Sequence, residues 1–171
     1  MRLDGLDIRL LNAIQADNRL TAEALAERLP LSPSAITRRL QRLRAEGAIA
    51  ADVAILAEGV AAPRISSMVL VQLERHTPEG FQALRRELTG RAEVQWCAEI
   101  SGAFDLALIV TTRTLDELTE LIDTVFSQNP IVRRAESSLV KRRWKATWTV
   151  PLHDEDAAPA FPLRASRDGR G

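Results

Sequence analysis

The stretch that decides the fold is LSPSAITRRLQRLR, residues 31–44. Ser32 followed by Pro33 predicts a helix start, because serine caps free backbone N–H groups and proline at the first helical position sacrifices no hydrogen bond. At about 100° per residue the helix has two distinct faces. One face is apolar and consists of Ile36, Leu40 and Leu43. The other face carries serine, threonine, glutamine and arginine, and no acidic residue occurs in the stretch.

A shorter helix is predicted directly before this one. Thr21 caps the run TAEALAERL, residues 21–29, whose apolar positions recur at helical spacing. Only Pro30 and Leu31 separate this run from the Ser32 cap. Two short helices joined by so tight a turn form a helix-turn-helix, whose second helix enters the major groove of DNA. A basic helix alone is more often a solvated surface, but the preceding helix favours DNA recognition.

A third helix completes a small N-terminal domain. Asp4 and Asp7 have the spacing of a capping box for a helix over residues 4–17. Gly47 is the left-handed residue expected just beyond the end of the recognition helix. Residues 1–50 hold eight arginines and six acidic residues, so the net positive charge of this domain is small. We predict a DNA-binding domain over residues 1–50.

Seven side chains of this domain are candidates for contact with DNA. Arginine and glutamine form specific hydrogen bonds with base edges, whereas contacts to phosphate mainly position the protein on DNA. The residues placed toward base edges are Ser34, Thr37, Arg38, Gln41 and Arg42. The residues placed toward phosphate are Ser32 and Arg39. An ion pair with an acidic residue such as Asp7 or Glu46 is the structural alternative for Arg39.

The sequence changes character after residue 50. Residues 51–64 predict a linker with a short strand, and alternating apolar residues then predict the order β-α-β-β-α-β, which is the ferredoxin-like pattern. The predicted strands cover residues 65–74, 93–101, 104–111 and 131–150, and the predicted helices begin near Thr77 and Thr114. The predicted fold class is therefore α+β: a winged-type helix-turn-helix domain followed by a ferredoxin-like domain over residues 65–152. Residues 153–171 show no periodicity and are expected to be a disordered tail; the alternative is that they fold onto a partner subunit.

The predicted sheet is apolar on both faces, while its own two helices can cover only one. A bare apolar face is unfavourable in water. We therefore expect at least a dimer through that face. A dimer would also present two helix-turn-helix domains to two DNA half-sites.

Composition limits the class of protein further. The chain has 171 residues with 23 basic and 23 acidic side chains, so any nucleic-acid footprint must be local. Its one cysteine excludes an internal disulfide. No apolar run approaches the roughly 18 residues of a membrane-spanning helix, and no secretory signal is evident. We expect a soluble cytoplasmic protein with no cofactor and no metal site.

The order of these parts resembles a known family. The first half contains LDxxLL from Leu6, LA at residues 25–26, and LSxSxxxRRLxRLxxxGxI from Leu31; the second contains SGAFD from Ser101 and PL at residues 151–152. Together they resemble the leucine-responsive/asparagine-regulator (Lrp/AsnC) family of feast/famine transcription factors. The second half resembles that family's RAM domain, which regulates amino-acid metabolism. The resemblance implies DNA binding by dimers that assemble further, often to octamers, and tuning of that binding by small molecules, typically amino acids.

Three features depart from the family pattern. Pro30 stands where the family usually has glycine, so the turn must be built without a positive φ angle. Ala103 stands where the hairpin usually has an acidic residue. Residues 153–171 extend past the usual end of the domain.

An amino-acid effector needs an anion near its ammonium group and hydrogen-bond donors near its carboxylate. Asp105 could supply the anion, the backbone N–H groups around Gly102 the donors, and Ser137 or Ser138 a hydroxyl. The candidate effector-binding residues are Gly102, Ala103, Phe104, Asp105 and Ser138. Alternatively, Gly102 is simply a turn residue and Asp105 a charge at a strand edge.

The predicted function is a sequence-specific DNA-binding transcriptional regulator, not an enzyme, whose DNA binding or assembly is modulated by a small molecule. Its predicted partners are double-stranded DNA, an amino-acid effector, and further copies of the chain up to an octamer. One alternative is an enzyme subunit similar to sirohaem decarboxylase, but the second domain has a single histidine, His76, and no readable catalytic set. The other alternative is a DNA-architectural protein without an effector.

Overall fold

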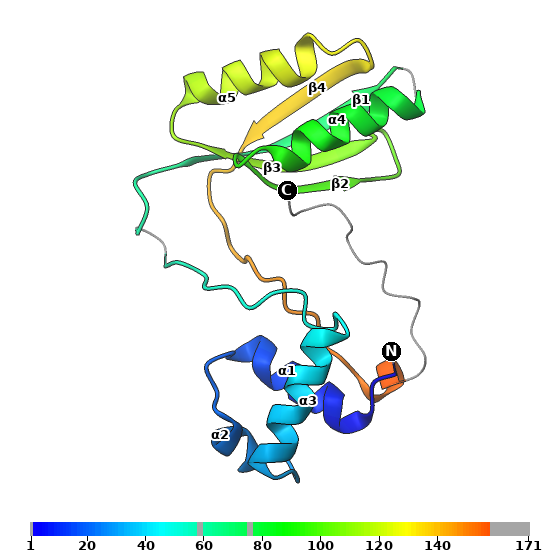
Figure 1. Cartoon of the computed structure of the whole chain (residues 1–171). Helices are drawn as coiled ribbons and strands as arrows, with labels where there is room; N and C mark the ends of the chain where they lie inside the picture. The colour runs from blue at the N-terminus through cyan, green and yellow to red at the C-terminus, as the bar shows by residue number, and fades with distance from the viewer. Residues whose placement is uncertain (1, 58–59, 75–76, 158–171) are drawn as a thin grey trace. The chain divides into compact units, whose positions relative to one another are not determined.

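The computed structural model describes residues 2–57, 60–74 and 77–157 of the chain. These residues form two compact units. The helical unit combines the N-terminal residues up to Ile55 with the residues after Lys145. The sheet unit comprises residues 56–145. The elements of each unit are labelled in Figure 1.

The helical unit contains the three predicted helices. They are α1 (Gly5–Ala16), α2 (Ala22–Ala26) and α3 (Pro33–Ala45). Their apolar stripes meet in one core. The buried members of this core are Leu10, Leu11, Ile14, Leu25, Leu29, Ile36 and Leu43. The helix-turn-helix prediction is confirmed.

The helix ends use the predicted local signals. The side chain of Asp4 accepts a hydrogen bond from the N–H of Asp7 at 2.8 Å, and the carboxylate of Asp7 accepts from the N–H of Asp4 at 3.1 Å. Ser32 caps α3 with Pro33 in the first turn. Gly47 follows α3 with φ of +78°, a conformation that side chains with a Cβ adopt only at a cost.

The turn between α2 and α3 is built around Pro30 without any positive φ angle, as expected. No described residue other than glycine has positive φ. Instead, the N–H of Leu31 donates to the carbonyl of Leu29 at 2.7 Å, which closes a three-residue turn.

The sheet unit has the predicted ferredoxin-like order. Its elements are β1 (Ile65–Leu73), α4 (Pro78–Gly90), β2 (Val94–Glu99), β3 (Leu106–Thr112), α5 (Leu115–Ile122) with the π-helical turn η1 (Asp123–Ser127), and β4 (Val132–Leu139). The strands lie in the order β2-β3-β1-β4, and every neighbouring pair is antiparallel. Helices α4 and α5 cover the same face of this sheet (Figure 1).

The core of the sheet unit lies between these helices and the sheet. On β1, Val69 and Val71 point into it and are fully buried, while Met68 between the core-facing positions is 45% exposed. Met68 pairs with Ile109, which pairs with Trp96, so this row continues an apolar strip on the face away from the helices. The strip stops at β4, which carries polar side chains there. The prediction of two apolar faces therefore holds for three strands and is wrong for β4.

The last strand is shorter than expected. It ends at Leu139 instead of residue 150 because its neighbour β1 begins at Ile65, and the N–H of Val140 makes the final bond, to the carbonyl of Ser66 at 2.8 Å. The predicted short strand is likewise absent, because residues 51–57 and 60–64 are in neither helix nor strand. Residues 146–152, predicted to belong to the second domain, lie with the helical unit.

The predicted disordered tail begins with an ordered turn. Asp154–Ala157 form a short 3-10 helix, η2. Residues 158–171, and also His76, lie outside the described residues. No helix in the described part of the chain is long and apolar enough to cross a membrane.

Candidate functional site

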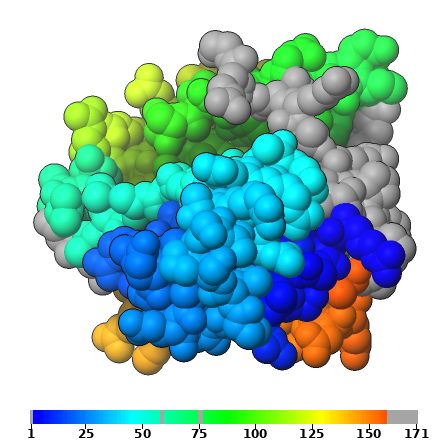
Figure 2. Space-filling model, turned by 60° about the horizontal axis from the view of Figure 1, so that its bottom comes forward, coloured from blue at the N-terminus to red at the C-terminus, as the bar shows by residue number. Residues whose placement is uncertain are grey.

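The outer face of α3 presents the polar side chains that the sequence places toward DNA bases. Ser34, Thr37, Arg38 and Gln41 are all exposed. The hydroxyl of Thr37 donates to the carbonyl of Pro33 at 3.0 Å, one turn earlier. Figure 2 shows α3, in light blue, at the surface of the helical unit. These side chains are therefore accessible from outside the helical unit.

Arg39 and Arg42 point instead toward α1. Nη1 of Arg39 lies 2.7 Å from Oδ2 of Asp4 and 2.7 Å from Oδ1 of Asp7, and Nη2 of Arg42 lies 2.5 Å from Oδ2 of Asp7. The side chain of Asp7 is only 1% exposed. Arg39 therefore forms the ion pair that was the alternative to a phosphate contact. Arg42, which was expected at a base edge, pairs with the same carboxylate, that of Asp7. Both arginines attach α3 to α1.

The electrostatics of Asp7 follow from these contacts. Burial by itself raises the pKa of this carboxyl group, but hydrogen bonds from Arg42, the Asp4 N–H and Arg39 outweigh it and hold the pKa below its usual 3.8. Asp7 is therefore charged at neutral pH and offsets part of the positive charge of α3. A recess of about 340 Å³ is formed by this cluster together with Arg2 and Arg38.

A second ion pair attaches the start of the linker to the helical unit. Nε of Arg44 lies 2.8 Å from Oδ2 of Asp52, and the side-chain amide of Asn18 donates to Oδ1 of Asp52 at 2.9 Å. The sequence offered no periodic or capping signal for this contact, which joins the end of α3 to the turn after α1.

The predicted hairpin between β2 and β3 is attached to β1 through Asp105. Oδ2 of Asp105 accepts a hydrogen bond from the N–H of Leu73 at 2.7 Å, and its N–H donates to the carbonyl of Val71 at 2.9 Å. Gly102 has φ of +149°, a region open almost only to glycine. The Asp105 carboxylate therefore already satisfies a backbone donor at the end of β1.

The other predicted effector residues separate into two places. Phe104 lies in the hairpin, and the guanidinium of Arg134 on β4 stands 5.3 Å from its ring centroid. Ser138 lies four residues further along β4, about 13 Å away at strand spacing, where it pairs with Met68. Within one chain the structure groups residues 102–105 with Arg134 and leaves Ser138 outside. Arg134 is not among the predicted effector residues, because nothing in the sequence places it near the hairpin before the strand register is known.

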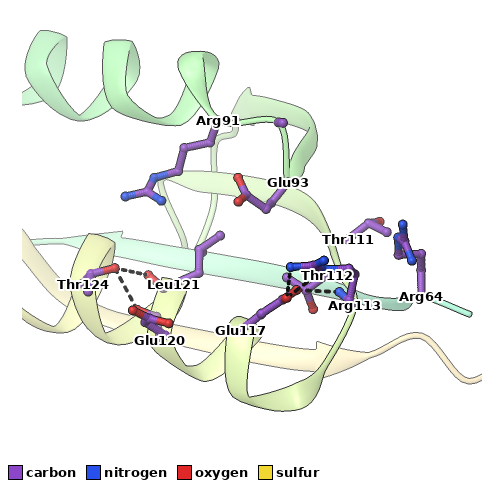
Figure 3. A pocket seen from close by; sticks show the side chains of 11 residues that line it. Arg64, Arg91, Glu93, Thr111, Thr112, Arg113, Glu117, Glu120, Leu121 and Thr124 are labelled. Atoms are coloured by element: carbon purple, nitrogen blue, oxygen red, sulfur yellow. Dashed lines mark hydrogen bonds and ion pairs between the residues drawn. The ribbon is translucent and has the colours of Figure 1, made fainter. Parts of the chain in front are cut away.

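A groove of about 680 Å³ lies at the opposite end of the sheet, where β2 begins and β3 ends. Figure 3 shows Arg91 and Glu93 on one side of it, with Glu120, Leu121 and Thr124 on the other. Arg113 and Glu117 pair across its rim at 2.8 Å. Nη2 of Arg91 bonds Glu87 at 2.9 Å, but its buried Nε donates to no atom of the described chain. The sequence carried no indication of this groove.

A helix-turn-helix with an exposed polar recognition face, followed by a ferredoxin-like unit, defines a DNA-binding transcription regulator with a separate ligand-binding domain. Residues 3–50 match the sequence profile of a winged helix-turn-helix DNA-binding domain. Residues 66–150 match the profile of the Lrp/AsnC ligand binding domain. The chain belongs to the Lrp/AsnC family of transcriptional regulators.

Known proteins similar to this chain are regulators of the same kind. An uncharacterized HTH-type transcriptional regulator of Sinorhizobium fredii is 37% identical, covering 89% of this chain and 90% of its own length. The leucine-responsive regulatory protein of Haemophilus influenzae is 27% identical, covering 85% and 87%. A transcriptional regulator of Neisseria meningitidis, solved in complex with L-Met, is 28% identical with a TM-score of 0.79, covering 90% of this chain and 99% of that one.

Replacing Asp7 tests the attachment of α3. Asp7→Asn should lower the free energy of unfolding at neutral pH by about 3 kcal/mol. The substitution removes the buried negative charge that neutralises Arg39 and Arg42, and both guanidinium groups then face an uncharged amide. The folded-state pKa of Asp7 is lowered, so its stabilisation is complete well above pH 3.8 and is lost as the pH falls through the folded value. Urea unfolding from pH 7 to pH 2.5 should show the difference between wild type and variant shrinking below pH 3.8.

Asp17→Asn is the matched control, because Asp17 pairs at the surface with Arg19. It should leave the stability unchanged. A difference between Asp7→Asn and wild type that stays constant across the whole pH range would contradict the ion-pair assignment.

Proposed function

We propose that this protein is a sequence-specific DNA-binding transcriptional regulator whose DNA binding or assembly responds to a small molecule, with an amino acid as the first class to test. The observation that carries the proposal is the exposed polar face of α3 in a chain that also has its family's ligand-binding domain. The L-Met complex of the Neisseria meningitidis regulator supports the choice of ligand class. We further propose that the protein acts in the cytoplasm.

In this proposal the residues of α3 divide into two roles. Ser34, Thr37, Arg38 and Gln41 contact base edges in the major groove, and Ser32 at the helix start contacts phosphate. Arg39 and Arg42 keep their ion pairs with Asp7 and set the orientation of the helix. Arg42 remains 37% exposed, which leaves it able to reach a phosphate as well.

The proposed effector site is the hairpin of residues 102–105. Backbone N–H groups beside Gly102 suit a carboxylate, and Asp105 can attract an ammonium group while it accepts from Leu73. Arg134, above Phe104, adds a cation next to the same hairpin. The groove around Arg91 is the second location to test, favoured by the buried Nε, which has no acceptor among the residues that the structure describes.

The face of the sheet away from the helices is proposed to meet a second copy of the chain. Its apolar strip of Met68, Ile109 and Trp96 is a surface that a symmetric partner covers with the same strip. Dimers of this kind can associate further, up to an octamer.

Arg38→Ala tests the DNA interface. A bidentate base contact contributes about 1–3 kcal/mol of discrimination, so binding to an operator selected from genomic fragments should weaken about 10-fold or more. Fluorescence anisotropy at fixed salt measures this. Arg86→Ala on α4, which removes the same charge from the sheet unit, should bind normally. Equal affinity of Arg38→Ala and wild type would refute the assignment.

Asp105→Asn tests the effector site without removing the acceptor for the Leu73 N–H. Calorimetric titration with L-methionine should show loss of binding, because the charge that faces the ammonium group is gone, while DNA affinity and stability stay near wild type. Arg91→Gln should titrate like wild type. If only Arg91→Gln lost L-methionine binding, the ligand site would be the groove around Arg91 and not the hairpin.

Met68→Lys tests the dimer face. A charge in the middle of the apolar strip should give a folded monomer in sedimentation velocity, because burying an unpaired ammonium group is strongly unfavourable. Gln82→Lys, on the exposed side of α4, should sediment as wild type does. A dimeric Met68→Lys protein would mean that the copies associate through another surface.

A further inference from the structure

Helix α1 holds the backbone of the C-terminal segment, residues 146–157, with two side-chain amides. The amide of Asn12 donates to the carbonyl of Leu152 at 2.8 Å and accepts from its N–H at 3.0 Å. The amide of Gln15 donates to the carbonyl of Val150 at 3.0 Å and accepts from its N–H at 2.9 Å. We call this pair of side chains the amide clamp. Each amide satisfies both backbone groups of one residue, as a neighbouring antiparallel strand does.

The amide clamp is possible because the spacing of the two amides on α1 matches the spacing of the two backbone positions on the C-terminal segment. Asn12 and Gln15 are three residues apart, so they are neighbours on one edge of α1. Val150 and Leu152 are alternate residues of an extended segment, so their backbone groups point to the same side. Pro151 between them has no N–H group, and none is needed there. The clamp recognises this segment mainly through its backbone.

The rest of the segment also packs on the helical unit. Leu152 contacts the core formed by the three helices. The turn η2 follows, closed by a hydrogen bond from the N–H of His153 to the carboxylate of Asp156 at 2.7 Å. Oδ1 of Asp154 lies 4.0 Å from the position that a Cβ of Gly5 would occupy, at the N-terminal end of α1 where a negative charge is favourable. The segment thus runs beside α1 from Gln15 back to Gly5.

The same helix orients α3, because Asp4 and Asp7 of α1 hold Arg39 and Arg42. The C-terminal segment also continues directly from the sheet unit, which ends at Lys145. On the basis of the proposed function, we propose that the C-terminal segment is a positioning element of the DNA-binding unit. It fixes α1 through the amide clamp, and α1 fixes the recognition helix through Asp7.

This arrangement joins the two units by two chain segments. The chain passes from the helical unit to the sheet unit after Ile55 and returns to the helical unit after Lys145. A displacement of the sheet unit that pulls the C-terminal segment away from α1 breaks four hydrogen bonds and exposes Leu152. The C-terminal segment is thus a covalent connection from the sheet unit to α1, which in turn holds α3.

The double variant Asn12→Ala/Gln15→Ala tests the proposal in the full chain. Hydrogen exchange at the amides of Val150 and Leu152 should accelerate about 10-fold or more, because their acceptors are lost. Affinity for the selected operator should fall about 10-fold, equivalent to 1.4 kcal/mol, because α1 and with it α3 become less well ordered. Exchange at Val69 in the sheet unit should not change.

Two shortened chains provide the matched comparison. A chain ending at Ala157 keeps the clamp and should bind DNA as the full chain does, whereas one ending at Lys145 should bind like the double variant. If the second fails to fold, the double variant still gives the answer. Fast exchange together with wild-type DNA affinity would overturn the positioning role, and unchanged exchange would overturn the clamp itself. If the wild-type protein binds no duplex at low salt, the proposed function fails and the positioning role fails with it, whereas exchange would still report the clamp.

Discussion

The buried carboxylate of Asp7 is the constraint on which the helical unit depends. A charge with 1% exposure is tolerated only when it is paired and hydrogen-bonded, and here two arginines of α3 and the backbone N–H of Asp4 provide this. The same contacts direct Arg39 and Arg42 away from the exposed face of α3. Of the four arginines of α3, two attach the helix to α1, Arg44 pairs with Asp52, and Arg38 remains exposed.

Helix α1 consequently holds both α3 and the C-terminal segment within the helical unit. One edge carries the acidic residues that hold α3, and another carries Asn12 and Gln15, which hold the end of the chain. In the proposed positioning role, the C-terminal segment connects the sheet unit to α1 and, through α1, to α3.

In the sheet unit, the local sequence pattern determines which residues form strands, and the register with β1 determines where the neighbouring strands end. Strand β1 is central, with β3 and β4 on either side, and its length limits both neighbours. Asp105 attaches the hairpin to the end of β1, while β4 stops where β1 begins. Sequence periodicity correctly predicted the four strands and two helices, because alternation and capping are local properties. It overestimated β4 because the availability of a neighbour is not a local property.

The amino-acid sequence alone established the helix-turn-helix, its caps at Asp4 and Ser32, the stop at Gly47, and the ferredoxin-like order of the second half. These features depend on residues within a few positions of one another. The partners of Arg42, the backbone contact of Asp105, the proximity of Arg134 to the hairpin and the amide clamp on the C-terminal segment depend on packing and register between residues far apart in the chain. Such contacts exist only once the elements are assembled, so the folded structure was needed to reveal them.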